Sequence, residues 1–250
     1  MNITIILAAG EGIRMKSKKS KVLHKIVNRT LIDYVYDASC DAGSDKTIII
    51  VGKNKLEVQD KFGDKVLYKE QKIGKEYPYG TGYAVQLTVD EISDDDNVLI
   101  LSGDTPLIKG ETLQKLLEEH IAMNSKATVL TAFIDDTTGY GHIIKDNNGK
   151  FLKIVEDKDA SIEEKRVKEI NSGIYVFNGK ALKNSITKID RNNVQNELYL
   201  TDAIKVLVQD GEFVSTYKLD DIEEIYGINS KLQLFEAEKI MRYRINAEYM

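Results

Sequence analysis

Cysteine and proline are both scarce in this sequence, with one cysteine and two prolines among 250 residues. A single thiol, that of Cys40, cannot form an internal disulfide, and no grouping of cysteine and histidine residues suggests a zinc site. We interpret Cys40 as a small apolar residue on a helix. Repeats and low-complexity tracts are absent too, so nothing indicates a linker. The length suits one large α/β domain or two small ones.

An excess of positive charge and a long apolar run are also missing. The chain carries 35 Lys and Arg against 40 Asp and Glu, a formal net charge of -5, whereas a general nucleic-acid-binding protein is expected to be basic. No apolar stretch approaches the roughly 20 residues that span a bilayer. No basic segment precedes the apolar start, residues 3–9, as it would in a signal peptide. We therefore expect a cytoplasmic protein without nucleic-acid or membrane partners, in which any anion site is a local concentration of positive charge.

Short apolar segments alternate with helical patterns through the first half of the chain. The expected strands are residues 2–7, 46–52, 65–69 and 97–104, and the expected helices are residues 31–42, a segment after residue 52, residues 80–92 and residues 111–123. Uninterrupted apolar strands are buried on both faces, which predicts a mostly parallel sheet with helices on both sides. Such sheets bind ligands beyond the carboxyl ends of their strands. Residues 7–12 and 102–104 lie at that edge.

The second half has a different pattern, with longer strands joined by hairpin turns. Its expected strands are residues 127–134, 141–146, 150–157 and 168–178, and helices are expected at about residues 196–210 and 229–248. We expect these strands to form an elaboration over the open side of the first sheet, within the same domain.

The segment LAAGEGIRMKSKKSKVLHKI, residues 7–26, is a small-residue turn followed by concentrated positive charge. Gly10 and Gly12 begin a dinucleotide-binding pattern. However, Met15 stands where both that pattern and the phosphate-loop pattern need a further glycine. The two glycines alone are therefore weak evidence, although glycines do allow backbone N–H groups to approach phosphate oxygens.

The charges that follow the glycines favour an anion site. Arg14 can offer a forked set of donors to a phosphate, and Lys21 can offer a compact charge. The alternative interpretation is a solvated basic loop, and we assign Lys16, Lys18 and Lys19 to it.

This segment resembles the signature LAAGxGTRM followed by PKxL of the sugar-phosphate nucleotidyltransferases. The ending KVLH is most similar to the N-acetylglucosamine-1-phosphate uridyltransferase branch, the N-terminal half of a bifunctional enzyme. Further blocks resemble the family in the same order: GTGYA (80–84), LSGDTPL (101–107), DDTTGYGHII (135–144), IVEDKDA (154–160), EINSGIYVF (169–177), NVQNELYLTD (193–202) and GINSKLQL (227–234). Because they cover nearly the whole chain in order, chance does not account for the resemblance.

The resemblance implies the family's fold, a Rossmann-like, mostly parallel twisted α/β sheet with helices on both faces and a β-rich sugar-binding elaboration. The implied reaction converts UTP and N-acetylglucosamine 1-phosphate into UDP-N-acetylglucosamine and pyrophosphate, with Mg²⁺. Arg14 would contact the leaving pyrophosphate, and Lys21 the α-phosphate and the sugar phosphate. Asp104 and Asn229 match the family's metal ligands, and Mg²⁺ prefers few carboxylates together with water and substrate phosphate.

The resemblance also implies which residues bind the two halves of the product. The nucleotide contacts would be Leu7, Ala8, Ala9, Gly10, Gln71, Gly80, Thr81, Ser102 and Gly103. The sugar contacts would be Gly141, Glu156 and Asn171, since amide and carboxylate groups can bond to sugar hydroxyls and to the N-acetyl group. No histidine is given a catalytic role: we interpret His142 as peripheral, His24 as structural and His120 as an exposed helix residue.

The sequence departs from the family pattern at several positions. Ile13 replaces the usual threonine of the signature, and His142 replaces an arginine next to Gly141. Ser20 replaces the usual proline before the basic residue, which removes a restraint on the loop. The family's QxxQLGTG becomes Tyr68-Lys-Glu-Gln71, followed by a longer loop, residues 72–79, before the GTG. Either Gln71 reads the base or base selectivity differs. We interpret Tyr79 of that loop as a packing residue.

We divide the chain into a nucleotidyltransferase domain, residues 1–228, and a helix, residues 229–250, that resembles the family's connector to a β-helix domain. The hexapeptide repeats of such a domain do not occur here, so we do not carry over acetyl transfer, and the oligomeric state stays open. The chain is then a shortened form of a longer protein or a free-standing uridyltransferase. The alternatives are a related sugar-1-phosphate nucleotidyltransferase with another base or sugar, a non-catalytic nucleotide-sugar sensor and, more remotely, a Rossmann oxidoreductase.

Overall fold

The computed structural model of the chain describes residues 1–10, 12–17, 19–53, 55–74 and 76–248. Parts of three sequence predictions lie outside the described residues: Lys18 of the basic loop, Lys75 of the loop 72–79, and residues 249–250 of the expected connector. Within the described part of the chain, no helix is both long and apolar enough to cross a membrane.

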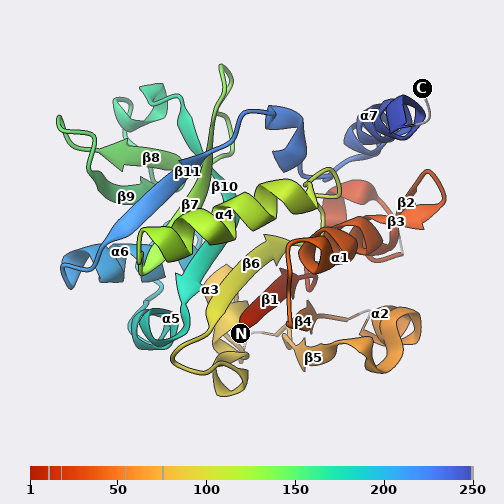
Figure 1. Cartoon of the computed structure of the whole chain (residues 1–250), viewed down its shortest axis with the longest axis horizontal. Coiled ribbons are helices and arrows are strands. Elements are labelled where there is room, and N and C mark those ends of the chain that lie inside the picture. Colours follow the sequence, from red (N-terminus) through yellow and green to blue (C-terminus); the bar gives the residue numbers. More distant parts are fainter. Residues whose placement is uncertain (11, 18, 54, 75, 249–250) are drawn as a thin grey trace.

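One twisted sheet runs through the centre of the molecule (Figure 1). The strands of its main path are β1 (Asn2–Leu7), β4 (Lys46–Val51), β5 (Leu67–Glu70), β6 (Asn97–Ser102), β7 (Ala127–Phe133), β10 (Glu169–Asn178) and β11 (Val214–Lys218). They lie in the order β11-β7-β10-β6-β1-β4-β5, and neighbouring strands are parallel except where β10 meets β6 and β7. The mostly parallel sheet predicted from the sequence is confirmed.

Helices cover both faces of this sheet, and each group packs in its own hydrophobic cluster. One face holds α1 (Leu31–Asp41), α2 (Lys55–Phe62) and α4 (Gly110–Ala122), and the other holds α3 (Thr81–Gln86), α5 (Gly179–Ile186) and α6 (Leu200–Gln209). In β1, Ile6 belongs to the first cluster, while Ile3 and Ile5 belong to the second. All three are fully buried, as expected for a central strand covered on both sides.

A third hydrophobic cluster packs the last helix against a hairpin near the start of the chain. The elements concerned are α7 (Lys231–Glu248), β2 (Lys25–Ile26) and β3 (Arg29–Thr30). Ile26, Leu107 and Met241 are buried together there. The packing returns the chain to the carboxyl end of β6, where the Ile228 N–H donates to the carbonyl oxygen of Asp104 at 2.9 Å.

The later strands extend the sheet instead of covering its open side. β7, β10 and β11 continue it beyond β6, and only β8 (His142–Lys145) and β9 (Phe151–Val155) leave the main path. These two form an antiparallel hairpin that joins β10, where Ile170 pairs with His142. The pairing of β10 with β7 shifts register between Asn171 and Tyr175. The elaboration is therefore continuous with the first sheet, which differs from the arrangement expected.

Some elements also differ from the predicted boundaries. The helix expected over 80–92 ends at Gln86. Thr88 is buried behind it, and both its N–H and its hydroxyl donate to the carbonyl oxygen of Val85, at 3.0 Å and 2.7 Å, which closes the end of the helix. Helix α5 and strand β11 were not predicted at all.

The prediction that His120 is exposed is wrong. Its exposed fraction is 2%, and its Nδ1 lies 2.8 Å from the hydroxyl of Thr128. The Thr128 hydroxyl lies 2.9 Å from the hydroxyl of Ser215, so that a buried chain of polar groups links α4, β7 and β11. The physical reason is that the last turns of α4 face the sheet. His142 is likewise fully buried, with Nδ1 3.1 Å from the carbonyl oxygen of Val167.

We expect His120 to make the fold sensitive to acid. Burial, together with the charge of Lys126, lowers the pKa of His120 to about 4, so the ring stays neutral in the fold while the unfolded chain binds a proton below pH ~6.5. Its contribution is complete above that pH and is lost as the pH falls toward 4. Between pH 7 and 4.5 this amounts to about 2 kcal/mol. Urea unfolding at both pH values should therefore show a smaller acid loss for His120→Gln than for the wild type, and an equal loss would contradict the assignment.

Candidate active site

A cavity of about 250 Å³ opens at the carboxyl ends of β1, β4 and β6, which is the edge where parallel sheets bind ligands. The turn after β1 contributes Leu7, Ala8, Ala9 and Gly10 to its wall. The other predicted site residues on the wall are Lys21, Gln71, Gly80, Thr81, Ser102 and Asp104. Gly103 sits behind them, with its N–H donating to the carbonyl oxygen of Leu7 at 2.9 Å. The structure thus brings the predicted nucleotide contacts together.

The turn after β1 is shaped by close backbone packing. The Ala8 N–H donates to the carbonyl oxygen of Ile50 at 2.9 Å, which continues the pairing of β1 with β4. Gly12 has a φ of +61°, and a Cβ added there would lie 2.7 Å from the Cβ of Lys21. A glycine at this position therefore lets the loop cross directly over Lys21.

Four polar side chains from distant parts of the sequence meet at the mouth of the cavity. The ammonium of Lys21 donates to Oδ2 of Asp104 and, at 3.0 Å, to Oδ1 of Asn229. The guanidinium of Arg14 donates to the same Asn229 oxygen at 3.0 Å. The side chains of Lys21 and Asp104 are 14% and 15% exposed, so this ion pair is only partly screened by solvent. The two predicted catalytic residues and the two predicted metal ligands form one contact network.

The oxygen atoms of Asp104 and Asn229 suit a hard divalent metal ion. Both lie within hydrogen-bonding distance of one cation, the Lys21 ammonium, so the two oxygens already converge on a single position. Among the residues that the structure describes, no group of three or more His, Cys, Asp and Glu is placed to hold a metal. A site with one carboxylate and one amide fits an ion that keeps several waters and binds substrate phosphate.

Gln71 and Tyr68 take different positions. Gln71 is 6% exposed, lines the cavity, and donates from Nε2 to the carbonyl oxygen of Gly80 at 3.3 Å. Tyr68 packs against the cluster on the α1 and α2 face, and its hydroxyl donates to the carbonyl oxygen of Gly63 at 2.9 Å. Of the residues at the family's two glutamine positions, Gln71 is the one that lines the cavity.

The predicted sugar contacts form a second group. The Asn171 N–H donates to the carbonyl oxygen of Gly141 at 2.8 Å, and a Cβ added to Gly141 would lie 3.5 Å from Oε2 of Glu156. Glu156 accepts a hydrogen bond from Thr201 at 3.0 Å, and burial raises the pKa of its carboxyl group. β10 connects this group to the cavity, because the Cβ position of Gly173 lies 4.0 Å from the Ser102 hydroxyl.

A family model described as nucleotidyl transferase matches residues 3–224. This chain belongs to the nucleotidyl transferase family. Among curated proteins, it is 45% identical over 246 residues to the Bifunctional protein GlmU of Clostridioides difficile strain 630, covering 98% of this chain and 53% of that protein. It is 46% identical over 248 residues to the Bifunctional protein GlmU of Caldanaerobacter subterraneus, covering 99% of this chain and 53% of that protein. The chain spans about half the length of these curated relatives.

A solved structure supports the same fold for this nucleotidyl transferase. A UDP-glucose pyrophosphorylase complexed with UDP-glucose superposes with a TM-score of 0.78 and 17% sequence identity, covering 98% of this chain and 99% of that chain. The expected fold, a mostly parallel sheet with helices on both faces, is confirmed.

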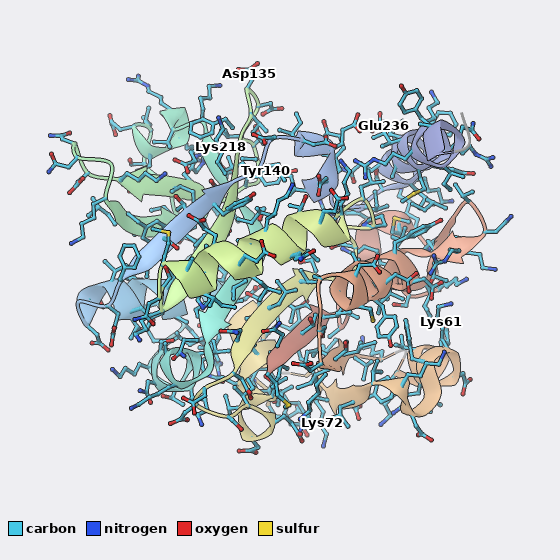
Figure 2. The ribbon with its side chains drawn as sticks, viewed as in Figure 1. Lys61, Lys72, Asp135, Tyr140, Lys218 and Glu236 are labelled. Atoms are coloured by element: carbon cyan, nitrogen blue, oxygen red, sulfur yellow. The ribbon has the colours of Figure 1, made fainter. Side chains whose placement is uncertain are left out.

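Sequence reasoning missed some residues of the nucleotidyl transferase cavity. Tyr79, interpreted as a packing residue, lines the cavity, and so does Glu197, which had no assigned role. The signal for Glu197 was present, since NVQNELYLTD resembles the family. Glu197 reaches the cavity because the Leu198 N–H donates to the carbonyl oxygen of Tyr79 at 2.8 Å, a contact between distant segments. In Figure 2, Lys72, the first residue of the loop 72–79, and Asp135, in the loop between β7 and β8, lie at opposite ends of the view.

Gly80 is expected to be the least replaceable glycine of this wall. Its φ is +116°, and a Cβ would lie 2.3 Å from the carbonyl oxygen of Leu198, the group that also accepts from the Gly82 N–H at 2.8 Å. Gly80→Ala should therefore lower the free energy of unfolding by about 3 kcal/mol. Gly10→Ala is the matched control, because nothing lies within 4 Å of that Cβ position. Urea unfolding of both variants tests this, and equal stabilities would contradict it.

Proposed function

We propose that this nucleotidyl transferase transfers a uridylyl group from UTP to N-acetylglucosamine 1-phosphate, giving UDP-N-acetylglucosamine and pyrophosphate. The observation that carries the proposal is the convergence of Arg14, Lys21, Asp104 and Asn229 at the mouth of the cavity at the sheet edge. The identity of about 45% to proteins named GlmU over nearly the whole chain adds support.

The nucleotide binds in the cavity of about 250 Å³. The backbone of residues 7–10 contacts the base and ribose, and Gln71 reads the uracil edge from its buried position beside Gly80. A buried amide is suited to this task because it offers one acceptor and two donors. Ser102 completes the wall below the phosphates, and Gly103 lies behind it, with its N–H bonded to the carbonyl oxygen of Leu7.

The sugar binds to Gly141, Glu156 and Asn171. The hydrogen bond from the Asn171 N–H to Gly141 fixes the relative positions of two of these residues. Thr201 holds the Glu156 carboxyl group, which leaves its second oxygen available to a sugar hydroxyl. The buried and hydrogen-bonded setting favours a single orientation of the sugar.

The chemistry requires positioning and charge neutralisation instead of a general base. A sugar phosphate has a second pKa of about 6, so its oxygen is already largely ionised at pH 7. The difficulty is to bring two polyanions together. Lys21 neutralises the α-phosphate and the attacking phosphate, while Arg14 binds the departing pyrophosphate with its forked donors. Asp104 and Asn229 would hold Mg²⁺, which supplies further charge neutralisation when bound.

The test measures pyrophosphate release with Mg²⁺, UTP and N-acetylglucosamine 1-phosphate. In parallel assays CTP, GTP or dTTP replaces UTP, and glucose 1-phosphate replaces N-acetylglucosamine 1-phosphate. Selective release with the first pair is the expected result. Release with another pair would support the same reaction class but would change the assigned substrates. One observation favours that alternative: Tyr68 stands at the family's first glutamine position, and it is not among the residues that line the cavity. No release with any pair, despite binding of UDP-N-acetylglucosamine, would favour a nucleotide-sugar sensor.

A further inference from the structure

The ammonium of Lys21 lies between the two oxygens that suit a metal. It donates to Oδ2 of Asp104 and, at 3.0 Å, to Oδ1 of Asn229. We propose that Lys21 is an exchangeable internal cation. Before substrate binds, it holds the oxygens of Asp104 and Asn229 together and competes with a divalent metal for them. This rests on the proposed function only for the identity of the anion that later receives Lys21.

The local charges support this competition. Two cations, Arg14 and Lys21, contact a pair of ligands that carries only one negative charge, that of Asp104. A divalent ion entering this group would meet two like charges within a few ångströms. Such repulsion is substantial where solvent screening is weak, and the Lys21 and Asp104 side chains are each about 15% exposed. The free enzyme should therefore bind a divalent metal weakly.

An incoming phosphate can release the lysine from this position. Lys21 lines the nucleotide cavity as well as contacting Asp104, so its flexible stem can carry the ammonium from the carboxylate to a phosphate oxygen. Arg14 can leave the Asn229 oxygen in the same way, because it is held there by one hydrogen bond to a neutral amide. Both movements expose metal-ligating oxygens as the substrate brings in negative charge. Nucleotide and metal are then expected to strengthen each other's binding.

Replacing Lys21 distinguishes this proposal from a purely structural role, because the two predict opposite changes in metal affinity. Without the ammonium, Asp104 is a largely buried carboxylate lacking its partner, and a metal can restore the lost neutralisation. Lys21→Met should therefore bind metal more tightly than the wild type while turnover collapses. A residue that only supported the site would, when removed, weaken metal binding and turnover together.

The experiment measures Mn²⁺ binding to the full chain without nucleotide or sugar phosphate, from the electron paramagnetic resonance signal of free Mn²⁺. We expect Lys21→Met to bind about tenfold or more tightly than the wild type. The stabilisation that Mn²⁺ gives in thermal unfolding should rise in parallel. Lys19→Met is the matched control, because it removes the same charge from an exposed position in the same loop. It should leave Mn²⁺ affinity unchanged.

Equal or weaker Mn²⁺ binding by Lys21→Met overturns the proposal. An equal gain in Lys19→Met also overturns it, because net charge would then explain the effect. Adding Asp104→Asn to Lys21→Met should remove the gain, and retention of tight binding would place the ion elsewhere. If Lys21→Met does not fold, Lys21→Gln makes the same neutral replacement, with the same expected result. The Mn²⁺ measurement contains no substrate, so its result does not depend on the proposed function. Failure of the uridylyl-transfer proposal would instead appear in the pyrophosphate-release assay of the wild type.

Discussion

Asp104→Asn is expected to lower Mg²⁺-dependent turnover roughly 10³-fold, the scale set by losing several kcal/mol of transition-state charge stabilisation. Asn keeps the size of the side chain and its position after β6, where the backbone carbonyl of residue 104 accepts from the Ile228 N–H at 2.9 Å. What changes is the charge of the one carboxylate in the ligand pair. Lys21 also loses the anion that it contacts.

The measurement is the initial rate of pyrophosphate release over a wide range of Mg²⁺ concentrations. If Asp104 is a metal ligand, raising Mg²⁺ should recover part of the rate, so that the apparent Mg²⁺ requirement rises along with the loss of kcat. Asp94→Asn is the control, because it makes the same isosteric change at an exposed ion pair with Lys183. A rate for Asp104→Asn close to that of Asp94→Asn at ordinary Mg²⁺ would remove Asp104 from the metal site.

Local hydrophobic patterns in the sequence were sufficient to predict most strands of the sheet. β1 and β6 are short apolar runs between small or polar residues, and both start and end close to the predicted positions. α5 was not recognised, although its cap was readable: the Asn178 side chain accepts from the Ala181 N–H at 3.1 Å. β11 is a different case, because it is a short, partly polar segment whose place beside β7 depends on pairing across a long stretch of chain.

His120 shows that a readable pattern can be overlooked. It lies seven residues after Leu113 and four after Leu116, and all three are buried on the same side of α4. This spacing is that of a single helix face. A polar residue type favours exposure, but the hydroxyl of Thr128 gives the His120 ring a buried partner.

The site depended on distant contacts that spacing alone could not predict. Asp104 and Asn229 come together because α7 packs against the hairpin β2–β3 and the chain returns through Ile228 to the end of β6. Only the resemblance to a family indicated that pairing. It gave no sign that the Lys21 ammonium would lie between the two oxygens, because that contact depends on the path of a loop.

The second large effect is expected for Arg14→Met, which should lower kcat by roughly 10²- to 10³-fold, the scale for losing one transition-state electrostatic contact. The free energy of unfolding of this variant should stay nearly unchanged. Arg14 is exposed, and its side chain makes a single hydrogen bond, to the Asn229 amide. Lys16→Met, an exposed position in the same loop, is the control and should retain near wild-type kcat.

The assignment of Arg14 to the departing pyrophosphate makes a narrower prediction. If Arg14 binds the departing pyrophosphate, added pyrophosphate should inhibit the forward reaction by occupying the same position, because a forked guanidinium binds such an anion better than a point charge does. Arg14→Met should therefore need a much higher pyrophosphate concentration for the same inhibition, while the KM for N-acetylglucosamine 1-phosphate changes little. If the KM for the sugar phosphate rises and pyrophosphate inhibition is unchanged, Arg14 acts on the attacking phosphate, and its role must be exchanged with that given to Lys21.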